Sequence, residues 1–169
     1  MYIVSSLAEA LASVPPQLAT LIIAALPIAE LRGSIPVALT VYDMSVPSTF
    51  FWSVLGNMIP VYFILILFEK VSAWLRVRSK KIDQLLTWLF ERTQHKLEKN
   101  VAKYGWWALA IFVAIPFPAT GAWSGALAAF VFGFPKKKAF FAILTGVVIA
   151  AVIVTILTVG ATATVKAFN

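Results

Sequence analysis

The chain has 169 residues, of which 61% are hydrophobic and 12% are charged, whereas soluble domains carry about 25% charged residues. This composition predicts a single membrane domain, residues 1–169, and the absence of cysteine excludes disulfides and thiolate metal sites. The net charge of +7 does not indicate nucleic-acid binding, because most basic residues cluster between Lys70 and Lys103, as at the cytoplasmic surface of membrane proteins. With His95 as the one histidine, we expect no metal ion and no cofactor.

The first half of the chain, residues 14–68, contains a broken apolar segment and an uninterrupted one. Residues 17–42 are apolar but are interrupted by charged and helix-breaking residues, namely Pro27, Glu30, Arg32, Gly33 and Pro36. Residues 48–68 are apolar throughout. As a helix they would extend roughly 30 Å, which is enough to span a membrane.

Residues 69–104 carry most of the charge and separate the two halves. Apolar residues recur within this segment at helical spacing, at Ile82, Leu85, Leu86, Leu89 and Phe90. This pattern predicts a cytoplasmic amphipathic helix that lies on the membrane surface.

The second half, residues 105–165, repeats the pattern of the first. Residues 105–134 are apolar and are broken by two prolines and two glycines, Pro116, Pro118, Gly121 and Gly125. Three lysines, 136–138, follow, and residues 139–165 form a second uninterrupted span.

The basic clusters decide the predicted topology. They flank residues 105–134 on both sides, so both ends of that segment are expected in the cytoplasm. A helix of this length reaches about 45 Å, whereas two full crossings need about 60 Å, and we therefore predict a re-entrant hairpin. If residues 17–42 form a matching hairpin, it enters from outside and both termini are external; the alternative is one kinked span with the N-terminus inside. The predicted fold is all-α, an inverted repeat of re-entrant hairpin plus transmembrane helix, which is typical of transporters.

Glu30 and Arg32 are two charged residues in a segment predicted to lie inside the membrane. A charge at the membrane centre costs about 2.5–3.5 kcal/mol on insertion scales, so the pair needs a partner or water. Two residues apart on a helix, they would point away from each other, but in an unwound tip they could converge. Arg32 suits a phosphate through its fork of donors, and Glu30 could exchange a proton because burial favours the neutral carboxyl. The alternatives are a purely structural ion pair, or two charges that reach the outer surface.

Other polar residues accompany this pair. Ser34, two residues before a proline, is predicted to cap a helix that begins inside the first tip, and Thr120 to cap a matching helix in the second. Two helix N-termini that point inward would favour an anion. Asn57, inside the first uninterrupted span, predicts a structural interhelical hydrogen bond. The candidate substrate-binding residues are Glu30, Arg32, Ser34, Thr120, Gly121 and Trp123.

Two segments, residues 30–36 (ELRGSIP) and residues 114–127 (AIPFPATGAWSGAL), resemble the small multi-drug export protein family. That family in turn resembles a distant branch of the DedA/VTT superfamily. The resemblance covers roughly residues 15–160 and implies inverted re-entrant hairpins in a multi-pass protein of a prokaryotic cell membrane. The superfamily is associated with proton-dependent movement of lipid carriers such as polyprenyl phosphate, and Glu30 would match its first-hairpin acidic residue. The second-hairpin arginines of DedA proteins are absent here, so Arg32 would take over their role.

Three hypotheses of function follow. The first is a proton-coupled transporter or flippase for an anionic lipid carrier, and the second is a proton-coupled exporter of small cationic or amphipathic compounds. Arg32 separates them, because an anion site needs it and a cation site does not. The third is a membrane scaffold. We expect no enzyme, because no histidine, paired carboxylates or serine–base pair is placed at membrane depth. The expected partners are membrane lipids, a lipid-phosphate or small-molecule substrate and protons; homo-oligomerisation stays open.

Overall fold

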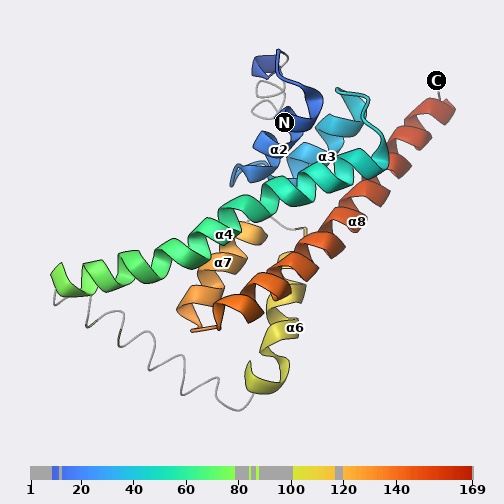
Figure 1. The fold of residues 1–169 in the computed structure, drawn as a ribbon. Coiled ribbons are helices and arrows are strands. Elements are labelled where there is room, and N and C mark those ends of the chain that lie inside the picture. The colour runs from blue at the N-terminus through green and yellow to red at the C-terminus, as the bar shows by residue number, and fades with distance from the viewer. Residues whose placement is uncertain are drawn as a thin grey trace.

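The structure is a computed structural model that describes residues 9–11, 13–78, 84, 87, 101–116 and 120–168. In this part of the chain six α-helices of ten or more residues follow one another as two sets, each of two shorter helices and one long helix, and there is no strand (Figure 1). The first set is α2 (Pro16–Ala25), α3 (Glu30–Thr40) and α4 (Val46–Arg78), and the second is α6 (Val101–Ala114), α7 (Ala122–Val131) and α8 (Lys136–Phe168).

The shorter helices end where the sequence places helix-breaking residues. α2 begins with Pro16, a position where the missing N–H of proline would have no helical partner. It ends before Leu26, whose extended backbone precedes Pro27. α2 and α3 have 10 and 11 residues, roughly 15 Å and 16 Å, about half the apolar thickness of a membrane. The two helices lie side by side (Figure 1), so the first broken segment folds as a pair of half-length helices.

Both uninterrupted segments form long helices, as the sequence predicts. Their apolar parts, Val46–Leu67 and Lys136–Thr164, have 22 and 29 residues and are long enough to cross a membrane. α4 differs from the prediction at its end, because it continues to Arg78. Residues 69–78 contain no glycine or proline that would stop it. Most of the remaining amphipathic segment, from residue 79 to residue 100, lies outside the described residues.

The helices of the two halves pair in the same pattern. α2 packs on α4 and α6 packs on α8, whereas α3 also contacts α8 and α7 also contacts α4. Each long helix has a glycine where the first short helix of its half crosses it. A Cβ at Gly56 would lie 2.9 Å from the Leu21 Cα atom, and one at Gly146 would lie 2.7 Å from the Val113 Cβ atom. The second half therefore repeats the helix contacts of the first, and in both halves a glycine lies where the first short helix packs on the long one.

The buried core lies between α3, α4, α6, α7 and α8 and contains many small residues. Ala122 and Ala126 of α7 and Ala139 of α8 belong to one buried cluster. Large apolar side chains lie on the outside, where Phe63 and Ile156 are 61% and 65% exposed. Small residues at helix contacts and large apolar residues on the surface are typical of helices that pack within lipid.

Candidate functional site

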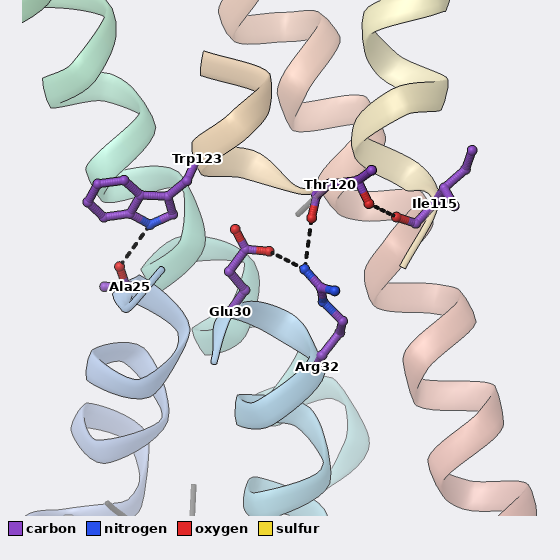
Figure 2. Close-up of polar contacts among 6 residues, drawn as sticks. All are labelled: Ala25, Glu30, Arg32, Ile115, Thr120 and Trp123. Atoms are coloured by element: carbon purple, nitrogen blue, oxygen red, sulfur yellow. Dashed lines mark hydrogen bonds and ion pairs between the residues drawn. The ribbon is translucent and has the colours of Figure 1, made fainter. Parts of the chain in front are cut away.

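Each half has a tip, the place where its two short helices are interrupted: between α2 and α3 in the first half and between α6 and α7 in the second. The two tips are joined by hydrogen bonds (Figure 2). Arg32 of α3 donates from Nη2 to the carbonyl oxygen of Thr120, just before α7, at 2.8 Å. Trp123 of α7 donates from Nε1 to the carbonyl oxygen of Ala25 at 3.2 Å. Ala25 is the last residue of α2, so its carbonyl has no donor from a following helical turn. The breaks therefore supply the groups through which the two halves bind each other.

Glu30 and Arg32 converge on each other and form an ion pair, one of the arrangements that the sequence leaves open. Arg32 Nη2 lies 3.2 Å from Glu30 Oε2, and the Glu30 residue is only 5% exposed. Glu30 is the first residue of α3, but its backbone has φ 46°, the left-handed region that costs non-glycine residues roughly 1–2 kcal/mol. In a regular helix the side chains of Glu30 and Arg32 would point apart. The left-handed backbone of Glu30 departs from that geometry, and the two side chains form an ion pair. The alternative with both charges at the outer surface does not hold for Glu30.

The Glu30 carboxylate lies at the N-terminus of α7. It lies near the Trp123 backbone N–H, and α7 has no side-chain cap of its own among the described residues. A Cβ at Gly121, the N-cap residue, would collide with Oε2 and lie 2.8 Å from Cδ of Glu30. Gly121 has φ 143° and ψ −167°, a conformation essentially restricted to glycine. A carboxylate of the first half thus occupies the anion-binding end of a helix of the second half.

The two predicted serine and threonine caps are wrong. Ser34 lies inside α3, because that helix begins four residues earlier, at Glu30. Its buried hydroxyl donates to Ser53 Oγ of α4 at 3.0 Å. The Thr120 hydroxyl donates to the Ile115 carbonyl oxygen at 2.7 Å instead of capping α7. The Ser34 hydroxyl therefore joins α3 to α4, and the Thr120 hydroxyl stabilises the break between α6 and α7.

A small cavity lies beside the ion pair. Its volume is about 10 Å³, roughly the space that one water molecule requires. Four of the six candidate substrate-binding residues line it, and the other two, Ser34 and Trp123, are not among the described residues that do. Most of the remaining wall is apolar, from α6, α8 and the segment after α6. The lining candidates are Glu30, Arg32, Thr120 and Gly121. The described residues leave no room there for a substrate larger than a water molecule, so they place the two tips in contact.

Asn57 of α4 also lines this cavity, although the sequence analysis assigned it a structural hydrogen bond. It is 1% exposed, and its Oδ1 atom has no hydrogen-bond partner among the described residues. That prediction is therefore wrong for Oδ1, and a buried acceptor without a partner costs about 1–3 kcal/mol. The position of Asn57 in the sequence indicates that it lies level with the tips. It follows Val46, the start of α4, by eleven residues, or roughly 16 Å along the helix, which is about the length of the short helices.

Comparison with known proteins identifies one family. The model of the family described as putative small multi-drug export proteins matches residues 30–153. The match begins at Glu30, the first residue of α3. It includes the break between α6 and α7 and about half of α8, whereas α2 and the residues between α2 and α3 precede it. No curated protein and no solved structure matches the chain.

Proposed function

Because the chain belongs to the small multi-drug export family, whose description indicates export across a membrane, we propose that its substrate passes through the point where the broken helices meet. The proposed substrate is an anionic lipid carrier such as a polyprenyl phosphate, and the proposed driving force is a proton that binds Glu30. We propose a transport role without enzymatic chemistry.

The helix arrangement supports a transporter with two inverted, re-entrant halves. α2 and α3 are each too short to cross the apolar part of a membrane, and so are α6, with 14 residues, and α7, with 10. The two halves make the same helix contacts. Inverted repeats whose broken helices meet near the membrane midplane form the substrate sites of many secondary transporters.

The observation that carries the anion proposal is the environment of the Glu30 carboxylate. Arg32 donates to it, and it lies against Gly121, the N-cap residue of α7. Guanidinium groups and helix N-termini both commonly bind phosphate in proteins. Glu30 therefore occupies a site whose donors would suit a substrate anion.

This arrangement supplies a coupling mechanism. When Glu30 binds a proton, its carboxyl group loses the charge that attracts Arg32 and the N-terminus of α7. Arg32 and the α7 N–H groups then become available to the phosphate of the substrate. When the substrate leaves, Glu30 releases the proton and again binds Arg32. Proton and anion thus bind together, and ionised Glu30 competes with the anion.

A second candidate function, export of a small cationic compound, is favoured by Asn57. Its Oδ1 atom is a buried acceptor without a partner among the described residues, and it lines the same cavity as the Glu30 carboxylate. Two acceptors in one cavity suit an ammonium group or another hydrogen-bond donor. In this case Glu30 itself would bind the substrate, and Arg32 would weaken binding.

Glu30→Gln separates the two candidates, because it mimics the neutral carboxyl group. Binding of a polyprenyl phosphate to the purified protein is measured beside binding of the uncharged alcohol and of a quaternary ammonium amphiphile. For the anion site, Glu30→Gln should strengthen phosphate binding about tenfold, the equivalent of about 1.4 kcal/mol for a lost charged hydrogen bond. For the cation site, it should abolish ammonium binding instead.

Arg32→Ala tests the anion site by removing the side chain that is proposed to bind the phosphate. Loss of phosphate binding is expected, with partial loss in Arg32→Lys, which keeps the charge without the fork of donors. Arg78→Ala is the matched control, because Arg78 lies over the Trp74 ring at the far end of α4. If Arg32→Ala does not fold, Glu30→Gln/Arg32→Ala removes the unpaired carboxylate. Full phosphate binding by a folded variant without Arg32, or equal binding of alcohol and phosphate, would refute the anion proposal.

A further inference from the structure

A second cavity lies on the outside of the protein, where α4 and α8 pass each other. It is an open groove of about 300 Å³ with almost entirely apolar walls. Tyr62 and Ile66 of α4 form one side, and Phe140 and Phe141 of α8 form the other. Tyr62 and Phe141 are more than half exposed. In a membrane this groove would face the lipid acyl chains.

One end of the groove is basic. Lys136 and Lys137, at the start of α8, are part of its lining, and both are exposed. No acidic residue is among the described residues that line it. The groove therefore combines an apolar channel with exposed lysine side chains at the start of α8, which complements a molecule with an apolar tail and an anionic head. Basic pockets between membrane helices on the cytoplasmic side bind anionic lipid head groups in this way.

We propose that this groove is a binding site for one anionic phospholipid of the surrounding membrane. An acyl chain lies between Tyr62 and Phe141, and the phosphate of the head group lies against Lys137 and Lys136. The tyrosine hydroxyl is suited to the boundary between apolar chains and head groups, where tyrosine is enriched in membrane proteins.

The groove is independent of the transport site. Its lining shares no described residue with the cavity beside Glu30 and Arg32. The lipid proposal requires only that the protein lies in a membrane, so it holds whichever substrate is exported. Because the groove lies at the contact of the two long helices, one from each half, a bound lipid would hold the halves together.

Lys138 provides a matched control. It follows Lys137 directly and is also exposed, but it is not among the residues that line the groove. Attraction of a lipid by general surface charge would depend on all three lysines equally. A specific site would depend on Lys137 and Lys136 and tolerate the loss of Lys138.

The test is native mass spectrometry of the purified protein, titrated with phosphatidylglycerol or with phosphatidylcholine of the same chains. One bound phosphatidylglycerol per protein is expected, with weaker phosphatidylcholine binding. Lys137→Gln should weaken phosphatidylglycerol binding about fivefold, and Lys136→Gln/Lys137→Gln should weaken it further, whereas Lys138→Gln should leave it unchanged. Phe141→Ala, at an exposed wall position, should weaken both lipids alike.

Two results would overturn the site. Equal binding of the two lipids by the unmodified protein would show that the head group is not recognised. Equal loss in Lys137→Gln and Lys138→Gln would show that general surface charge, and not the groove, attracts the lipid.

Discussion

Gly121→Ala is the substitution for which the structure predicts the clearest loss of stability. The added Cβ would collide with the Glu30 carboxylate, and overpacking of this kind typically costs about 1–3 kcal/mol. In addition, Gly121 has φ 143° and ψ −167°, and a non-glycine residue held in that region costs about 1–3 kcal/mol. The two effects are distinct, so the free energy of unfolding should fall by about 2–6 kcal/mol.

A double-mutant cycle separates the two effects. In a Glu30→Ala background the collision is absent and only the backbone strain remains, so Gly121→Ala should cost about 1–3 kcal/mol less than in the unmodified protein. Unfolding is followed by circular dichroism in mixed micelles with increasing dodecyl sulfate. Gly160→Ala is the control, because a Cβ at Gly160 meets no atom within 4 Å. It should be neutral or stabilise the helix by up to about 1 kcal/mol.

The reasoning would be refuted by either of two results. Gly121→Ala could be as well tolerated as Gly160→Ala, which would mean that the Glu30 carboxylate does not lie against the start of α7. Alternatively, its cost could be the same with and without the Glu30 side chain, which would assign the whole effect to the backbone.

Three further predictions concern the packing and the topology. Gly146→Ala should destabilise the protein by about 1–3 kcal/mol in the same unfolding assay, because its Cβ would overlap α6; a cost below that of Gly160→Ala would contradict the close contact. Trp123→Phe removes the hydrogen bond to α2 and should cost about 0.6–1.7 kcal/mol; an unchanged unfolding midpoint would show that this bond does not join the tips. In whole cells a membrane-impermeant thiol reagent should label Asp43→Cys, and Lys137→Cys only after permeabilisation; the opposite pattern would reverse the topology.

The sequence predicts the helices well because their ends depend on local chemistry. Proline stops α2 and α6, and glycine precedes α7, so the breaks could be read directly from Pro27, Pro116 and Gly121. The two long helices follow from uninterrupted apolar runs, whose length matches a membrane. The end of α4 was misplaced because charge was used as the boundary. Charged residues with high helix propensity do not end a helix, and residues 69–78 continue it to Arg78.

The contacts within the site could not be predicted to the same extent, because they depend on both halves. The sequence leaves the convergence of Glu30 and Arg32 open as one possibility, whereas the contact of Glu30 with Gly121 depends on the second tip. Ser34 was interpreted as a cap because a proline follows it, yet Pro36 lies inside α3. Asn57 was assigned a structural bond because most polar residues in membrane helices have one. Its position beside the ion pair follows only from the packing of α4 on both tips.

The strength of the contacts between the tips fits a site that opens and closes. Within a membrane, apolar surface does not drive helices together, so close packing of small residues and a few hydrogen bonds decide the arrangement. Two described side-chain hydrogen bonds join the broken ends, Arg32 to Thr120 and Trp123 to Ala25. The charged one is worth about 1.5–3 kcal/mol and the neutral one about 0.6 kcal/mol. Their sum, about 2–4 kcal/mol, would favour the closed tips by roughly 30- to 1000-fold. Under the proposed function, a proton on Glu30 together with an anion that binds Arg32 in place of Thr120 would have to supply a comparable free energy to shift the population to the open state.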